Sequence, residues 1–460
     1  MCDSSDDDMQ AEDASLLHHP AEEHRGVLFT MRLAFFATTS YLCLYGLRKP
    51  WVVLIYTDVP PILGVSAKIG IAAAQMVSYF CGKTFGVGLV SRVPQAKLHR
   101  TLALAGGAAA LGWLGFAMLP IGIFTLLSAA ITGFPLALTW CLIYRYVEGR
   151  RCSDAVGGVL GCSIVVGPGL AKLVCAALLR QCASLGLTEW HAPLLTACVA
   201  YPLLLLCLWG LTRTPPPTPS EIAELGDRAV VVGGASGGQG PISRLLGEHW
   251  MGIVAVGTYN ALYTGAREVR DIFQPELWLV LYSRPPDART FLATELPATV
   301  LLLLVLPAVS TVRSAPRALV MMHGLMLISA LTMPLLGGVR ALGGGAVWFS
   351  LLGAAIFLGT VTVTAGFSDR LVSALRLSGS SATLIQILDA CGYAGSLATL
   401  AAVETFSPAP GQMLATAETL FAWVGPAAAV CALLSAAYWS QAIRNRAGAA
   451  GAWHASKEHG

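Results

Sequence analysis

Two stretches of the sequence share one pattern: Tyr41-Leu-Cys-Leu-Tyr45, followed by Arg48, and Tyr259-Asn-Ala-Leu-Tyr263, followed by Arg267. Each stretch lies late in the first long apolar segment of its half of the chain. Tyrosines four residues apart share one helix face, and an arginine three or four residues further on extends it. Phenols and a guanidinium at the end of an apolar helix indicate an anion site. One such stripe in each half predicts a transporter with its site between the halves.

The composition is that of a protein that crosses a membrane many times. The 460 residues are 55% hydrophobic and only 12% charged, with a mean hydropathy of +0.66. A soluble domain carries about 25% charged residues. We therefore predict an all-α membrane protein embedded in the lipid bilayer. A net charge of +3, without a basic tract that interleaves aromatic residues, argues against binding to nucleic acid.

The apolar segments divide into two sets of six on either side of a flexible linker. A membrane-spanning helix needs about 20 apolar residues, and we count about twelve such segments. They lie at 27–47, 63–88, 101–120, 122–146, 154–180, 192–211, 249–270, 291–312, 317–336, 344–367, 380–402 and 416–441.

The same pattern predicts the domain organisation. The linker carries a proline-rich run, Thr214–Pro219, and then a glycine-rich run, Gly233–Gly240. The first residues are acidic and polar, which is typical of a disordered tail rather than of a signal peptide. The predicted units are a cytosolic tail at 1–26, a six-helix bundle at 27–211, a cytosolic linker at 212–247, a second six-helix bundle at 248–443 and a cytosolic tail at 444–460.

The loop charges predict which side of the membrane each end occupies. If the N-terminus is cytosolic, most arginines and lysines outside the spans fall in the inner loops, and fewer fall in the outer loops. Positively charged loops stay in the cytoplasm. We therefore expect both termini to be cytosolic.

Several charged residues lie inside the predicted spans, where a charge costs about 2.5–3.5 kcal/mol on insertion scales and is therefore a candidate for function. Arg48 and Lys83 lie close enough to a helix end to reach the interface instead. Lys172 follows Gly167-Pro-Gly169, and a proline at that depth often borders a cavity, so we expect Lys172 to face it. Asp389 lies mid-span, either as a proton carrier or as a structural hydrogen-bonded carboxyl.

A dense charge cluster begins at Arg267. It comprises Arg267, Glu268, Arg270 and Asp271. Arg267 and Asp271 are four residues apart and can pair on one face. The cluster is then either a self-neutralising helix end or a gate whose pair exchanges when substrate arrives, with Glu295 as a further partner.

The sequence resembles the major facilitator superfamily, and within it the organophosphate:phosphate antiporters. The segment Tyr41-x3-Tyr45-x2-Arg48-Lys49-x-Trp51 resembles their first-helix signature, and Gly82-Lys83-Thr-Phe85 resembles a segment of their second helix. Arg267 stands eight residues before Pro275, as an arginine of their seventh helix does. The resemblance implies that Arg48 and Arg267 face each other across a cavity and hold a phosphate, with Lys83 nearby.

Other segments depart from that family. The loop after the second predicted helix has Ser91-Arg92 where the family has Asp-Arg, and Ile164 stands about where glycerol-phosphate members carry a histidine. The run that begins Arg267-Glu-Val-Arg-Asp, together with Arg48-Lys-Pro-Trp51, is closer to an uncharacterised branch of the superfamily.

Three functions remain open from the sequence. The first is exchange of an organic phosphate or phosphate, with Tyr41, Tyr45, Tyr259 and Tyr263 beside the arginines and the two lysines. The second is proton-coupled transport of a carboxylate or another small solute, with Asp389 as the titrating group. The third is a membrane sensor that has a transporter fold but does not transport. An enzyme is disfavoured, since no HExxH motif occurs and the acids form no plausible catalytic pair. We expect a monomer. We also expect no metal or cofactor, because no cysteine and histidine spacing fits zinc.

Overall fold

The computed structural model describes residues 20–56, 58–147, 150, 152–215, 240–312, 314–336, 344–375, 381–406 and 412–458. Most of the predicted 1–26 tail and most of the predicted 212–247 linker therefore lie outside the described residues. Their predicted flexibility stays a prediction.

The first half of the chain forms a bundle of long helices. Its members are α2 (Pro20–Arg48), α3 (Ala67–Arg92), α4 (Leu98–Met118), α5 (Ile123–Ala137), α6 (Thr139–Val147), α7 (Ser153–Cys182) and α8 (Ala192–Thr212), with the short 3₁₀ helix η1 (Pro50–Val53) after α2. The predicted span 122–146 is divided between α5 and α6 at Leu138. Pro135 lies inside α5, where it removes a backbone donor and weakens the helix just before this break.

The second half forms a matching bundle. Its members are α11 (Gly240–Ile272), α12 (Gln274–Tyr282), α13 (Ala288–Ala293), α14 (Leu296–Ser310), α15 (Ala315–Leu335), α16 (Gly345–Thr362), η7 (Val363–Phe367), α17 (Ser368–Ala374), α18 (Ser381–Phe406) and α19 (Met413–Glu458). α11 begins within the predicted linker and bends at His249, which has non-helical backbone angles. α19 continues as a helix through most of the predicted 444–460 tail.

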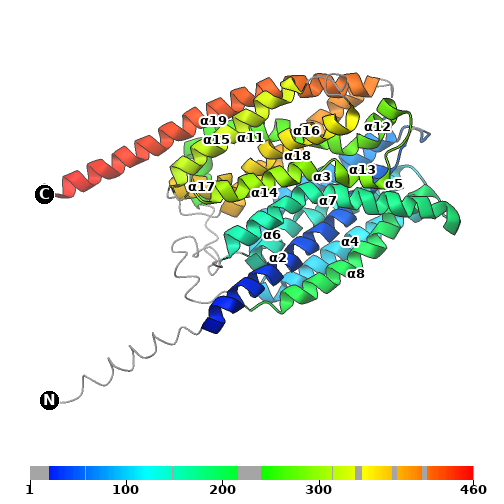
Figure 1. The fold of residues 1–460 in the computed structure, drawn as a ribbon, viewed down its shortest axis with the longest axis horizontal. Coiled ribbons are helices and arrows are strands. Elements are labelled where there is room, and N and C mark those ends of the chain that lie inside the picture. The colour runs from blue at the N-terminus through cyan, green and yellow to red at the C-terminus, as the bar shows by residue number, and fades with distance from the viewer. Residues whose placement is uncertain are drawn as a thin grey trace, which may run out of the picture.

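The two bundles lie side by side, and the described chain ends lie at one end of the molecule (Figure 1). In the ribbon, the helices of the first half, coloured from blue to green, form one layer, and the helices of the second half, coloured from green to red, form the other. Ten helices in the described part of the chain are long and apolar enough to cross a membrane. The predicted all-α membrane fold with two helical bundles is confirmed. α3 and α11 are absent from that set of ten, and both carry charged residues that face the other half.

Glycines allow the close helix contacts inside each bundle. In the second half, a Cβ on Gly395 of α18 would lie 2.3 Å from the Ala261 carbonyl oxygen of α11. In the first half, a Cβ on Gly133 of α5 would lie 2.3 Å from the Gln75 carbonyl oxygen of α3. Since lipid offers no hydrophobic drive between helices, such small-residue contacts hold membrane bundles together. They fix α3 and α11 in the positions from which their polar side chains reach the other half.

We predict that Gly395→Ala destabilises the protein, because the methyl group meets backbone rather than a flexible side chain. Overpacking of this kind costs about 1–3 kcal/mol. Gly158→Ala is the matched control, because a Cβ there meets nothing within 4 Å. Thermal unfolding of the purified variants in detergent measures the effect. Equal melting temperatures for the two variants would contradict the close α11–α18 contact.

Candidate functional site

A small polar cavity of about 50 Å³ lies between the two halves. Its charged lining residues are Arg48, Lys83, Arg267 and Asp389. Its aromatic lining residues are Tyr41, Tyr45, Tyr79, Trp140 and Tyr393. The first half supplies two of the three cations, and the second half supplies the third cation and the carboxylate.

Arg48 is a buried cation whose contacts in the described structure are aromatic. Its Nη2 donates to the Tyr393 hydroxyl at 2.9 Å, and its guanidinium lies 4.1 Å from the centre of the Tyr79 ring. Its side chain forms no ion pair with a carboxylate among the described residues. An arginine retained inside a membrane protein without an acid partner is positioned to bind an anion from outside the chain.

The sequence after Arg48 explains why neighbouring cations have different partners. Proline disfavours helical geometry in the residue before it, so Pro50 stops α2, and η1 follows. Gln75 holds this end by donating from Nε2 to the Arg48 carbonyl at 3.0 Å and accepting from the Trp51 indole at 3.1 Å. Arg48 therefore faces the cavity, while Lys49 faces the acids of α11.

The other charged groups of the cavity are paired. Arg267 donates from Nη2 to Glu268 Oε1 at 3.1 Å, and 15% of its side chain is exposed. Lys83 Nζ lies 2.9 Å from Asp389 Oδ2. Asp389 is the more accessible partner of this pair, with 20% of its side chain exposed against 2% for Lys83. The cavity thus holds one neutralised pair and two arginines.

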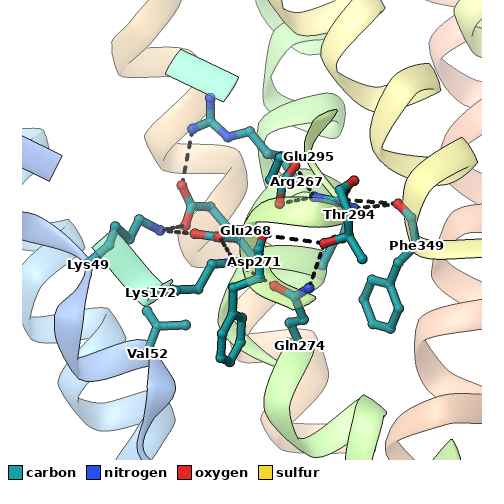
Figure 2. Close-up of polar contacts among 12 residues, drawn as sticks. Lys49, Val52, Lys172, Arg267, Glu268, Asp271, Gln274, Thr294, Glu295 and Phe349 are labelled. Atoms are coloured by element: carbon teal, nitrogen blue, oxygen red, sulfur yellow. Dashed lines mark hydrogen bonds and ion pairs between the residues drawn. The ribbon is translucent and has the colours of Figure 1, made fainter. Parts of the chain in front are cut away.

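A layer of buried ion pairs joins the two halves beside the cavity (Figure 2). Lys49 Nζ lies 2.5 Å from Glu268 Oε2 and 2.7 Å from Asp271 Oδ2. Lys172 Nζ lies 2.7 Å from Asp271 Oδ1 and donates to Gln274 Oε1 at 2.6 Å. Glu268 and Asp271 are three residues apart and share a helix face, so one lysine can reach both carboxylates.

Further contacts extend this layer toward the loops. Lys68 Nζ lies 2.5 Å from Glu276 Oε1 and also donates to the carbonyls of Val52 and Leu54. Glu404 accepts from the backbone and hydroxyl of Ser66 at 2.8 and 2.7 Å. In these ion pairs the lysine comes from the first half and the carboxylate from the second.

The layer lies further from the described chain ends than the cavity does. On α2, the cavity residues Tyr41 and Tyr45 precede Lys49. On α7, Ile164 lines the cavity and Lys172 follows it by eight residues, or about 12 Å of helix. The ion pairs therefore join the halves at one end, and the cavity lies on the other side of them.

The predicted pair between Arg267 and Asp271 is wrong. Asp271 pairs with Lys49 and Lys172, while Arg267 pairs with Glu268. Arg270 points into its own bundle, where Nη1 lies 2.9 Å from Glu295 Oε1. A one-residue step turns a helical side chain by about 100°, so adjacent charges of α11 meet different helices.

Three predicted positions lie away from the cavity. Lys172 is not among the lining residues, because α7 continues as a helix through Pro168 and carries this lysine to Asp271. Tyr259 and Tyr263 stack on each other at 4.6 Å, and the Tyr263 hydroxyl accepts from Ser329 at 2.7 Å. Their side chains pack inside the second bundle, so the phenolic stripe predicted for α11 does not reach the cavity. In its place α11 presents Asn260 and Thr264.

Sequence reasoning missed several residues of the site. Asn260, Tyr79 and Tyr393 line the cavity, but each has an ordinary residue type for a membrane helix. Lys49 and Lys68 could have been found from the sequence, because lysine is rare in this chain. Apart from Lys97 and Lys457, its lysines are all buried and paired across the halves.

The buried charges do not balance. In the described structure, the cavity and the buried pairs around it hold seven cationic side chains and five carboxylates, an excess of two positive charges. The cations are Arg48, Lys49, Lys68, Lys83, Lys172, Arg267 and Arg270, and the carboxylates are Glu268, Asp271, Glu276, Glu295 and Asp389. An excess of buried charge is costly unless it is compensated, so the site favours a bound anion. Among the described residues, no group of three or more His, Cys, Asp or Glu could hold a metal ion.

A family profile covers most of this architecture, matching residues 50–442. The chain belongs to the DUF5690 family. That family is described as one of unknown function. No curated protein sequence matches the chain significantly.

Solved structures share the fold. A bacterial homologue of the human drug peptide transporters PepT1 and PepT2 has a TM-score of 0.61 at 13% identity, covering 91% of this chain and 99% of that one. Tetrameric PepTSo2 has a TM-score of 0.59 at 14% identity, covering 90% of this chain and 98% of that one. A point mutant of the nucleoside transporter NupG gives 0.57 at 13%, covering 89% and 99%. The fold is therefore of the major facilitator type, in an integral multi-pass membrane protein. These comparisons do not support the organophosphate:phosphate branch.

We predict strong coupling between Lys172 and Asp271. Removing Asp271 leaves Lys172 as an uncompensated buried charge and costs about 3–5 kcal/mol, whereas replacing both partners by apolar residues costs much less. Asp271→Leu should therefore lower the melting temperature more than the double variant with Lys172→Met does, while Lys172→Met alone leaves Asp271 paired with Lys49. Lys49 keeps Glu268 as a partner in all three variants. Additive losses in the double variant would show that the pair does not act as a unit.

Proposed function

We propose that this protein is a secondary transporter of a small anionic solute, working by alternating access. The observation that carries the proposal is Arg48, a buried guanidinium that faces the cavity between the halves and has no carboxylate partner in the described structure. Arg267 faces the same cavity from the other half. An anion gripped by both arginines would draw the two bundles together.

The ion-pair layer gives a route from binding to movement. Arg267 and Lys49 both pair with Glu268. An anion that binds Arg267 in place of Glu268 therefore leaves Lys49 as the remaining ion-pair partner of Glu268. The layer between the halves is therefore sensitive to occupancy of the cavity. A ligand shifts a conformational equilibrium only through such differential contacts.

The chemical identity of the anion is open within this proposal. A phosphate or an organic phosphate fits two bidentate arginines, and a carboxylate fits them as well. The similar structures are transporters of peptides and of nucleosides by their descriptions, which supports transport of a small solute. Tyr41, Tyr45 and Lys83 complete the proposed binding surface.

Proton coupling is a second candidate property, and the Lys83–Asp389 pair supports it. One similar structure is described among proton-dependent oligopeptide transporters. Asp389 is the accessible member of its pair and lies in the cavity. A carboxylate that exchanges a lysine for a proton during transport would couple the two movements. A monomeric state and cytosolic termini stay predictions for this protein.

We predict that Arg48→Lys and Arg267→Lys each abolish most transport, because lysine keeps the charge but loses the bidentate fork. The uptake rate should fall roughly tenfold or more, since a hydrogen bond to a charged group contributes about 1.5–3 kcal/mol. The measurement is uptake into proteoliposomes preloaded with phosphate or with a dicarboxylate. Arg180→Lys, at the exposed end of α7, is the matched control.

The double arginine variant should be little worse than either single variant, because one site needs both halves. Full activity in both single variants would contradict the two-arginine site. Anion binding without any uptake in the unmodified protein would favour the sensor function instead.

We predict that Asp389→Asn loses accumulation driven by a proton gradient but retains exchange across the membrane. Asparagine keeps the volume of the side chain and removes its titration. Accumulation with and without an imposed pH gradient measures the difference, and size-exclusion chromatography checks folding. Undiminished proton-driven accumulation in the variant would reduce Asp389 to a structural partner of Lys83.

A further inference from the structure

The cavity contains a buried acceptor that no described residue satisfies. Asn260 lies on α11 with 1% of its surface exposed, and it lines the cavity. Its Nδ2 donates to the Leu388 carbonyl of α18 at 2.7 Å. Its Oδ1 is buried and has no hydrogen-bond partner among the described residues. The bond to Leu388 fixes the orientation of the amide, so Oδ1 is the side-chain atom that lacks a partner among the described residues.

An unpaired buried acceptor is unfavourable, and native proteins rarely retain one without a reason. The surrounding packing holds Asn260 in place. A Cβ on Gly392 of α18 would lie 3.0 Å from Nδ2 and 2.8 Å from the Thr264 hydroxyl. The amide is therefore clamped between two helices at the wall of the cavity.

The rest of the cavity shows what kind of group could satisfy this atom. On α11, Asn260 precedes Arg267 by seven residues, or about 10 Å of helix. On α18, Asp389 lies one residue after the carbonyl that binds Asn260, and Tyr393, the partner of Arg48, lies one turn beyond. The unsatisfied acceptor thus lies in the same cavity as Arg48, whose partner Tyr393 is one turn from Asp389 on α18.

The charges near Asn260 favour a neutral donor. Lys83 already neutralises Asp389 at 2.9 Å, and its ammonium would repel a second cation. A hydroxyl group donates a hydrogen bond without bringing a charge. The cavity is small in this conformation, which favours a small solute.

We propose that the transported anion also carries a hydroxyl group and that Asn260 Oδ1 accepts its hydrogen bond. This inference rests on the proposed transport function and names the substrate class, a small hydroxylated acid. Arg48 and Arg267 hold the anionic group, and Asn260 selects for the hydroxyl. A site built to hydrogen-bond a hydroxyl discriminates strongly against the analogue that lacks it, because its own polar group is then left unpaired.

Matched pairs of acids test the proposal on the purified full-length protein. The pairs are lactate and propionate, malate and succinate, and glycerol 3-phosphate and propyl phosphate. Ligand-induced shifts of the melting temperature over a concentration series give each dissociation constant. In at least one pair, the hydroxylated member should bind roughly tenfold tighter or more. The pair that responds also distinguishes a carboxylate from a phosphate.

Asn260→Leu should abolish this preference while the shared anionic group still binds. Ser396→Ala is the matched control, because Ser396 is buried on α18, bonds its own helix at the Gly392 carbonyl and is not a lining residue of the cavity. It should keep the preference. The comparison of the pairs on the unmodified protein needs no variant, so it holds even if Asn260→Leu fails to fold.

Two outcomes would overturn the inference. One is equal binding of both members in every pair, which would assign Asn260 Oδ1 to a water molecule. The other is an unchanged preference in Asn260→Leu. If no acid of either kind shifts the melting temperature of the unmodified protein or of Arg48→Gln, the proposed anion transport itself is contradicted. That result differs from equal binding of both members of a pair, which contradicts only the role of Asn260.

Discussion

The structure depends on lysines of the first half that reach carboxylates of the second half in a buried layer. Lys49 bridges Glu268 and Asp271, and Asp271 in turn bridges Lys49 and Lys172. Buried pairs are strong only while both partners stay in place, since the desolvation of each charge must be offset by the other. Such an interface holds one relative position of the bundles firmly, and it weakens as soon as one partner is withdrawn. That combination suits two rigid bundles that change their relative orientation.

The same layer explains why the cavity is positive. Pairing uses up the acids of α11, so Arg48 keeps only aromatic rings and the Tyr393 hydroxyl for contacts in the described structure. Arg267 must share Glu268 with Lys49. The cavity and the ion pairs are therefore one electrostatic unit, in which an added anion changes the balance on both sides. Glycine contacts such as Gly395 against Ala261 hold the helices that carry these charges.

The architecture was readable from the sequence, because span length and hydropathy fix helices in a bilayer. Four of the charges singled out in the sequence, Arg48, Lys83, Arg267 and Asp389, do line the cavity, whereas Lys172 does not; the roles of the four in binding stay predictions. The partners were not readable. Helical spacing allowed an Arg267–Asp271 pair, but the lysines of the other half, which are remote in sequence, compete for Asp271. The prediction that Tyr259 and Tyr263 face the cavity was wrong for a similar reason, since the repeated motif does not show which neighbouring helix its face contacts.

The distance between the halves at the ion-paired end tests the central claim most directly. Leu63 and Phe406 are exposed, belong to different halves and lie near the Ser66–Glu404 contact. Spin labels at these positions, read by pulsed electron paramagnetic resonance in lipid, should give one short distance in the otherwise unmodified protein. Replacing Lys49, Lys68 and Lys172 by glutamine should shift the distribution to longer distances. An unchanged short distance in that folded triple variant would contradict the claim that lysine–carboxylate pairs close this end.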